Sequence, residues 1–299
     1  MPVFIKPITD APERTLKFQL HRHLSQVQEG RPYHRIHASA LTREDPEFCP
    51  REYVIASLTK TKPQSETIVT SLAVTFEIGR MVQDQVINWF ADMGLAVGDW
   101  RCLACARLHT FAKRPVKCGL CGCRAFKPEE HRFESAFSGA SCGIDMMVDL
   151  GRPRHTIVEI KTIRPEDFGV LAAPLAEHRE RTNLYLRLIA ESDTPESNLV
   201  DTARAKVLYV SKGGYGKQDK QLGAWGLGEQ FSPFKEFDVN RDDQGSQPYW
   251  ERAKMIHDFR NGTEGIPMGV CPTMLCKRAK QCPVRHACFS GQYPAGAAA

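Results

Sequence analysis

The hydrophobic pattern of this chain switches between two periods. Large apolar residues recur three or four positions apart in five segments, as in helices, and gather in short runs in five others, which is typical of strands. The predicted helices are residues 12–28, a segment opened by Cys49 and Pro50, 67–93, 173–191 and 248–261, and the predicted strands are residues 131–137, 143–150, 155–162, 204–210 and 234–239. Apolar residues recur throughout 67–93, so that helix is expected to be mostly buried. This order of elements predicts an α/β fold with a central mixed sheet flanked by helices.

The composition is that of a globular protein. The chain has 299 residues, of which 42% are hydrophobic and 25% charged, close to the average for soluble domains. No stretch approaches the roughly 18 consecutive apolar residues of a membrane span, and the N-terminus lacks the apolar segment of a secretory signal. We therefore expect a cytoplasmic protein with no membrane partner. The odd count of eleven cysteines argues against a disulfide scaffold and favours metal ligands.

Positive charge is concentrated in the cysteine-containing segments. The net charge is only +5, yet residues 101–128 contain seven Lys or Arg and no carboxylate, and residues 271–299 repeat this bias. Basic charge beside thiols indicates metal-organised modules that meet a polyanion, through DNA phosphates or a partner protein.

Two of the predicted strands carry acidic residues among apolar ones. Positions i and i+2 of a strand face the same side, so Glu159 and Lys161 project together while Ile160 points into the core. A buried carboxylate is costly unless it is paired or binds an ion. We expect Asp145 and Glu159 to hold a hard divalent cation, with the Ile160 carbonyl as a further ligand. Lys161 would then serve the attacking water and the charge that develops on a phosphate.

The same residues resemble a known motif. Gly143, Ile144 and Asp145 are followed, about a dozen residues later, by Glu159, Ile160, Lys161 and Thr162. This arrangement resembles the PD-(D/E)XK nucleases, in particular their RecB-like exonuclease branch. The resemblance implies a restriction-endonuclease-like sheet, Mg²⁺ or Mn²⁺ as cofactor, and hydrolysis of DNA phosphodiester bonds.

A first departure from the branch concerns the helix before the core. The branch carries G-x-x-x-H there, but this chain has Gly79 followed by Gln83. Gln83 would complete the metal shell through its amide oxygen, or hydrogen-bond a metal-bound water. Glu77 or Asp84 would compensate for the missing histidine.

A second departure lies on the helix after the acidic strands. The branch carries Q-x-x-x-Y, whereas this chain has Arg181 and keeps the tyrosine as Tyr185. Arg181 would either grip a phosphate or pair with a carboxylate as a structural residue.

The cysteines at the two ends of the chain resemble the iron–sulfur nucleases of the same branch, such as the AddB-type and CRISPR-associated exonucleases. Their pattern implies a 4Fe–4S cluster that ties the ends together, with one ligand before the core and three after it. Cys49, Cys276, Cys282 and Cys288 are the favoured ligands, with Cys271 as the rival of Cys276. A structural zinc site would suit four thiolates equally well.

A third group of cysteines has zinc-ribbon spacing. Two C-x2-C pairs separated by twelve residues form tight knuckles around a tetrahedral ion. The predicted Zn²⁺ ligands are Cys102, Cys105, Cys118 and Cys121. Cys123 and His109 are the alternative ligands.

Together these features divide the chain into four parts. They are an N-terminal helical part of the nuclease domain at residues 1–99, a zinc-ribbon insertion at 100–125, the nuclease core at 126–262 and an iron–sulfur segment at 263–299. The resemblance implies an exonuclease acting 5′-to-3′ on single-stranded DNA or ends, with recombination, repair or phage DNA processing as its role in a bacterial or phage-infected cell. A spacer-trimming nuclease with CRISPR-adaptation partners and a DNA-binding scaffold with a decayed core are the alternatives.

Overall fold

The computed structural model describes residues 15–24, 27–28, 32–43, 48–63, 66–67, 69–213 and 232–293. Of the helix predicted over residues 12–28, Leu16–Leu24 is helical and residues 12–14 and 25–26 lie outside the described residues. The prediction is wrong for Val27–Gln28, which form a strand. The helices are α1 (Leu16–Leu24), α2 (Ala38–Leu41), α3 (Pro50–Leu58), α4 (Thr70–Asp92), α5 (Pro165–Val170), α6 (Ala176–Ala190), α7 (Asp243–Arg260), α8 (Lys277–Gln281) and α9 (Arg285–Ser290), with a 3-10 turn at Pro195–Leu199. The strands are β1 (Val27–Gln28), β2 (Ile36–His37), β3 (Glu66–Thr67), β4 (Ala96–Cys102), β5 (Leu108–Lys113), β6 (Phe126–Glu129), β7 (His131–Glu134), β8 (Ala140–Ile144), β9 (Met146–Val148), β10 (His155–Ile163), β11 (Val200–Ser211) and β12 (Phe234–Asn240).

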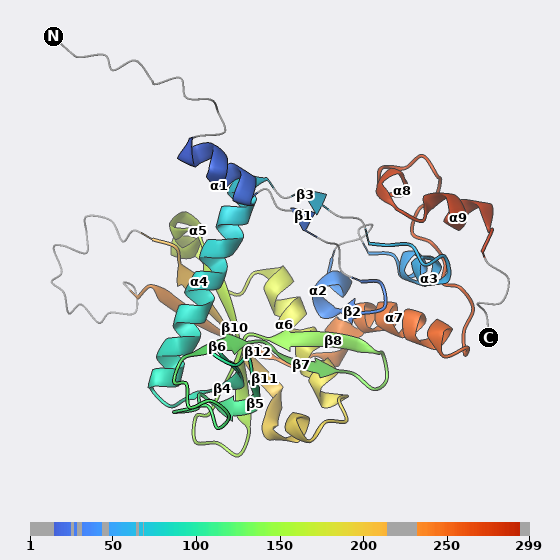
Figure 1. Cartoon of the computed structure of the whole chain (residues 1–299). Coiled ribbons are helices and arrows are strands. Elements are labelled where there is room, and N and C mark those ends of the chain that lie inside the picture. The colour runs from blue at the N-terminus through green and yellow to red at the C-terminus, as the bar shows by residue number, and fades with distance from the viewer. Residues whose placement is uncertain are drawn as a thin grey trace, which may run out of the picture.

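A mixed sheet flanked by helices forms the centre of the molecule (Figure 1). Its strand order is β12-β11-β10-β9-β4-β5, and β6 also pairs with β4. Strands β10 and β11 are parallel, and their neighbours in this sheet run antiparallel. The predicted α/β class with a mixed sheet is confirmed.

Alternation along β10 assigns its side chains to two cores. Ile157 packs in the core that includes Leu184 of α6, whereas Val158 and Ile160 pack in the core that includes Val86 of α4. Each buried aliphatic side chain of this size stabilises the fold by about 1.5–3 kcal/mol. Residues 159 and 161 therefore share the face of Ile157, toward α6, as the period of two requires.

The helix predicted over residues 67–93 forms as α4, but the expectation that it is mostly buried is wrong, because only two of its 23 residues are buried. Leu72, Phe76 and Met81 are 43%, 44% and 69% exposed, whereas Val86 and Ile87 are buried. Only the C-terminal half packs on the sheet, and the N-terminal half extends past it beside α1 (Figure 1). The spacing of apolar residues predicted the helix, but it did not predict how much of the helix the sheet covers.

The strand predicted over residues 143–150 is broken at Asp145. Strand β8 belongs to a small sheet with β2 and β7, and β9 belongs to the main sheet. The chain therefore changes sheets at the residue that was predicted to bind a cation. Asp145 lies at the corner where the chain passes from the sheet of β8 to the sheet of β9. Its side chain therefore does not have to pack into either hydrophobic core.

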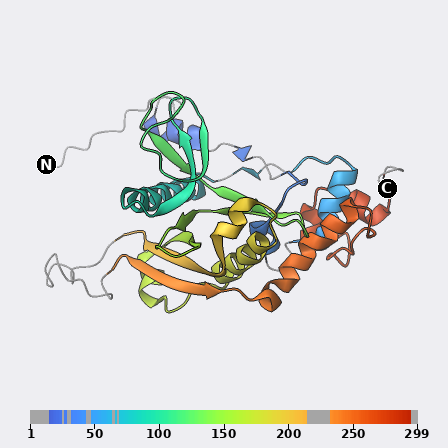
Figure 2. The ribbon, with the colours of Figure 1, turned by 90° about the horizontal axis from the view of Figure 1, so that it is seen from below.

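The cysteine-rich segment adds three strands that the hydrophobic pattern did not predict, namely β4, β5 and β6. Strand β4 pairs with β9 of the central sheet and runs across the boundary expected at residues 99 and 100. The ribbon is thus an extension of the sheet edge, and it lies beside the C-terminal end of α4 (Figure 2).

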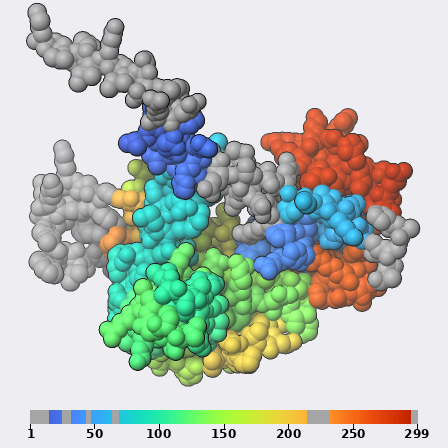
Figure 3. All heavy atoms as spheres, in the orientation of Figure 1, coloured from blue at the N-terminus to red at the C-terminus, as the bar shows by residue number. Residues whose placement is uncertain are grey.

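The C-terminal segment lies against α3, far from it in sequence. Val284 and Ala287 pack on Ile55 and Ala56 of α3, and helix α7 leads from the sheet to this contact (Figure 2). Figure 3 shows the same segments forming one lobe at the side of the molecule. Within the described ranges, no helix is both long and apolar enough to cross a membrane.

Candidate active site and cysteine sites

The predicted acidic residues meet in one pocket of about 330 Å³. Asp145 stands at the junction of β8 and β9, and Glu159 and Lys161 project from β10. The Lys161 ammonium lies 2.5 Å from Glu159 Oε1. Gln83 from α4 and Tyr185 from α6 line the same pocket. The tertiary structure therefore brings together the residues that the two strands and the two helical motifs placed far apart in sequence.

Asp145 is held in an environment that disfavours its charge. Burial first, and then the neighbouring Glu159 carboxylate, raise the pKa of Asp145 to about 8. Two donors hold the carboxylate in place, with the Ile160 amide at 2.8 Å from Oδ2 and the Gln83 side-chain amide at 3.0 Å from Oδ1. A carboxyl group with a raised pKa beside a second carboxyl group is typical of a site that a cation neutralises.

Glu159 supplies an independent sign of a bound cation. The residue is only 2% exposed, and its Oε2 atom has no hydrogen-bond partner among the described residues. Buried carboxylate oxygens need such a partner. Burial alone would lower the pKa of Lys161, but Glu159 and Asp145 outweigh it and raise that pKa above its usual value. The residues present therefore fit a hard divalent cation, whose preferred ligands are such oxygens.

Gln83 acts as a donor in this structure. Its Nε2 donates to Asp145, so its role as a ligand through the amide oxygen stays a prediction, as does that of the Ile160 carbonyl. Glu77 and Asp84, which were expected to compensate for the missing histidine, do not line the pocket. Glu77 pairs with Arg80 at 3.1 Å on the surface, and the pKa of Asp84 is raised by burial.

Arg181 and Tyr185 lie one helical turn apart, on the face of α6 that meets the pocket. Arg181 forms an ion pair with Glu177, while its buried Nε has no partner among the residues described. Both alternatives predicted for Arg181, a phosphate contact and a carboxylate pair, remain compatible with this placement. Burial raises the pKa of Tyr185 well above its usual value, so its hydroxyl stays protonated.

Four ionisable residues of the pocket were not predicted as site residues from the sequence. They are Arg35, His37, Glu130 and Arg132. Arg35 and His37 come from the segment around β2, and the other two flank the start of β7. The available signal was a glutamate, Glu130, directly before the strand predicted over residues 131–137 and an arginine, Arg132, at its second position. No spacing in the sequence could connect β2 with β10.

The ribbon cysteines converge as their spacing predicted. The sulfur atoms of Cys102, Cys105, Cys118 and Cys121 all lie within 4.8 Å of one another. Cys102 and Cys121 are 3.5 Å apart, and Cys105 and Cys118 are 3.6 Å apart. This group of four thiols could bind a metal ion. A tetrahedral ion with four thiolates is the arrangement of structural zinc.

Backbone amides of the knuckles favour the thiolate form that binds metal. The amide of Cys121, then the His109 side chain, lower the pKa of Cys118 to about 5. His109 thus lies beside the thiols without belonging to the group of four, and Cys123 instead contacts Ala125. The four-cysteine set, not these two alternatives, is the one that converges.

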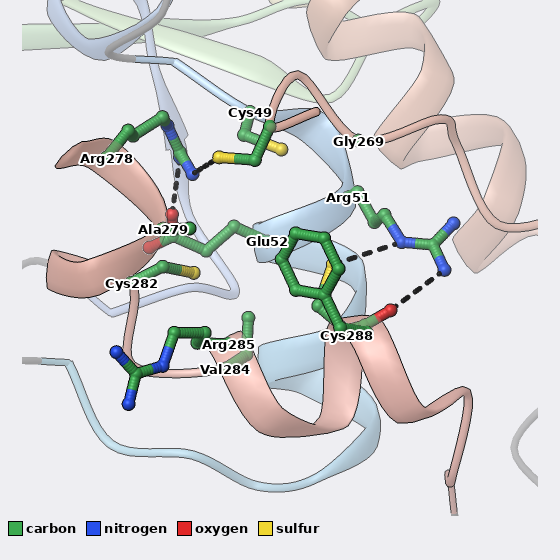
Figure 4. A pocket seen from close by; sticks show the side chains of 12 residues that line it. Cys49, Arg51, Glu52, Gly269, Arg278, Ala279, Cys282, Val284, Arg285 and Cys288 are labelled. Carbon is green, nitrogen blue, oxygen red and sulfur yellow. Dashed lines mark hydrogen bonds and ion pairs between the residues drawn. The ribbon is translucent and has the colours of Figure 1, made fainter. Parts of the chain in front are cut away.

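A second set of cysteines lines a cavity of about 210 Å³ between the start of α3 and the C-terminal segment (Figure 4). The lining thiols are Cys49, Cys271, Cys282 and Cys288. Cys49 precedes α3, and the others come from the C-terminal segment. The cavity is several times the roughly 30 Å³ that one water molecule occupies in the liquid, so it has room for a group of several atoms.

Cys276 does not line this cavity. Its sulfur instead accepts the Ala279 amide at 3.3 Å and begins helix α8. The Cys276 side chain nevertheless interacts with that of Cys271, which lines the cavity, so both cysteines remain predicted ligands.

Two arginines face the lining thiols. Arg51 Nε lies 3.3 Å from Cys288 Sγ, and Arg278 Nη1 lies 3.7 Å from Cys271 Sγ (Figure 4). Arg278 also pairs with Glu52 at 2.6 Å. These guanidinium groups offset negative charge that thiolates would place in the cavity.

Comparison with known proteins assigns no family. No family model matches the chain, and no curated protein matches it. One solved structure, titled "Crystal structure of SSO0001", aligns with 81% of this chain and 82% of its own, at 14% identity and a TM-score of 0.37. A likeness at this level carries no statement about fold or activity.

Proposed function

We propose that this protein is a metal-dependent nuclease that hydrolyses phosphodiester bonds in DNA. One observation carries the proposal: Asp145, Glu159 and Lys161 converge in a pocket where a buried Glu159 oxygen has no partner within the described residues. Two acidic groups that hold one cation, with a lysine beside them, can activate a water and stabilise the charge that develops on a phosphate.

The chain's own residues would divide the work. A bound Mg²⁺ or Mn²⁺ would lower the pKa of a water and neutralise charge on the phosphate. Asp145 and Glu159 would hold the cation, and Gln83 and the Ile160 amide would orient Asp145. Lys161, which lies against Glu159, would position the water and stabilise the developing charge. Arg181 lines the pocket, and its buried Nε has no hydrogen-bond partner among the described residues. Arg181 would contact a neighbouring phosphate of the DNA.

The finer assignment rests on the resemblance in the sequence. It is an exonuclease on single-stranded DNA or ends, acting 5′-to-3′ in recombination, repair or phage DNA processing in the cytoplasm. A 4Fe–4S cluster would occupy the cavity lined by Cys49, Cys271, Cys282 and Cys288, and Zn²⁺ would occupy the ribbon. The two metal groups would hold the chain ends and the sheet edge, because metal-binding energy becomes folding energy.

The test is digestion of end-labelled single- and double-stranded DNA with Mn²⁺. The parent protein should degrade DNA, and Glu159→Gln and Lys161→Ala should bind DNA without cutting it. Glu134→Gln, an exposed change on β7 outside the pocket, is the matched control and should cut at the parent rate. If the parent binds DNA without cutting it, the scaffold alternative is favoured. If either site variant cuts as the parent does, the site assignment is wrong.

A further inference from the structure

Glu130 is a third carboxylate at the mouth of the pocket. Strands β7 and β8 are antiparallel, with Arg132 opposite Gly143 and His131 opposite Ile144. Continuing this register by one step sets Glu130 beside Asp145. Glu130 lines the pocket together with Asp145 and Glu159. Directly opposite residues of an antiparallel pair have Cβ atoms only about 4.5–5.5 Å apart.

The absence of a side chain at Gly143 allows Glu130 to take this position. A Cβ atom on residue 143 would lie 2.4 Å from Glu130 Oε2 and 3.2 Å from its Cδ. The Glu130 carboxylate therefore lies directly over the backbone of β8 at Gly143. Gly143 thus has a physical role beyond its place in the motif, which is to admit a carboxylate next to Asp145.

Three carboxylates line the pocket beside Lys161, Arg35, Arg132 and Arg181, of which Arg181 pairs with Glu177 outside the pocket. Lys161 neutralises Glu159. Arg132 approaches Glu130 at 3.5 Å, but both side chains of this pair are about half exposed, and such pairs contribute little. Like charges placed opposite each other on paired strands are destabilising. The buried Glu159 Oε2 has no hydrogen-bond partner among the residues described, which points to a bound group that the described side chains do not replace.

We propose that Glu130 is the third carboxylate of the cation site and supplies the charged oxygen that the neutral Gln83 does not. The inference rests on the proposed function, since it concerns the same site. Across the described residues, only the ribbon thiols gather within 4.8 Å as a set of three or more. Glu130 therefore reaches the cation by turning its exposed side chain from Arg132, or through one water.

The test measures Mn²⁺ binding by the intact, zinc-loaded protein without DNA, by isothermal titration and Mn²⁺ paramagnetic resonance. Zinc remains in the ribbon because thiolates prefer it to manganese. Glu130→Gln keeps the side chain's size and should weaken Mn²⁺ binding by about 10- to 100-fold, the usual loss when a group supporting a metal is removed. Glu134→Gln at the other end of the adjoining strand β7 is the matched control and should bind as the parent does.

Gly143→Ala tests the geometry by an independent route. The new methyl group meets the flexible end of Glu130 rather than backbone, so it should displace the carboxylate while the fold persists. The variant should lose Mn²⁺ affinity as Glu130→Gln does, and the double variant should bind no more weakly than Glu130→Gln alone, because both changes remove the same contact.

The outcomes separate this inference from the proposed function. Parent-like Mn²⁺ binding by Glu130→Gln would overturn the role of Glu130, even if the parent cuts DNA. Glu130-dependent Mn²⁺ binding by a parent that cuts no DNA would support the cation site and overturn the nuclease. A parent that binds no Mn²⁺ would overturn both.

Discussion

Replacement of Asp145 by asparagine tests the electrostatics of the pocket through stability. Asp145 has an ordinary pKa of 3.8, which burial and Glu159 raise to about 8 in the folded, cation-free protein. The asparagine side chain would keep the shape and remove the charge. Its amide oxygen can accept the Ile160 amide, and its NH₂ group can donate to Gln83 once the Gln83 amide turns over. The variant should therefore be more stable than the parent at alkaline pH.

The sign follows from proton binding. Between pH 4 and 8 the folded parent holds a proton on Asp145 that the unfolded chain has lost, so the free energy of unfolding falls as pH rises. Each unit by which the pKa of Asp145 rises on folding lowers the free energy of unfolding by about 1.36 kcal/mol, so the whole rise lowers it by at most about 6 kcal/mol. Asp145 keeps partial contact with solvent, so we expect roughly half of this, about 2–3 kcal/mol, at pH 8.

The assay is thermal unfolding by far-ultraviolet circular dichroism from pH 5 to pH 8, in buffers freed of divalent cations. For a protein of this size, 1 kcal/mol shifts Tm by about 2–4 °C, so Asp145→Asn should melt several degrees above the parent at pH 8 and much closer to it at pH 5. Mn²⁺ should raise the Tm of the parent only, because a ligand stabilises the state that binds it.

Asp149→Asn is the matched control on the same segment. Lys113 lowers the pKa of Asp149, so this variant should be slightly less stable than the parent at neutral pH, the opposite sign. A Tm difference between Asp145→Asn and the parent that does not change with pH would refute the reasoning.

Two further predictions concern the cysteine sites. Cys105→Ser should lose the ribbon zinc, which elemental analysis measures. The far-ultraviolet circular dichroism of the central sheet should persist, because the ribbon joins that sheet at its edge through β4. An unchanged zinc content would contradict the site. Cys271→Ser should lose bound iron, measured as iron atoms per protein chain. Cys276→Ser should keep most of its iron, because of these two cysteines only Cys271 lines the cavity. Greater iron loss in Cys276→Ser than in Cys271→Ser would identify Cys276 as the ligand.

Local chemistry was largely predictable from the sequence. The period of two along β10 placed Glu159 and Lys161 on one face and Ile160 in the core, because a strand's alternation needs no knowledge of its neighbours. The ribbon spacing predicted four converging thiols, because each C-x2-C knuckle folds on itself. In both cases the residues that decide the geometry lie within a few positions of one another.

Long-range geometry was decided only by the tertiary structure. The break of the strand at Asp145, the exposure of Leu72 and Phe76 on α4, and the position of Cys271 in the wall of the cavity beside α3 depend on which segments meet across the fold. Glu130 likewise reaches Asp145 only because β7 pairs with β8 in one register. Sequence determined which groups each segment presents, and packing determined which of those groups share a site, because contacts between distant segments depend on how whole elements bury their apolar faces.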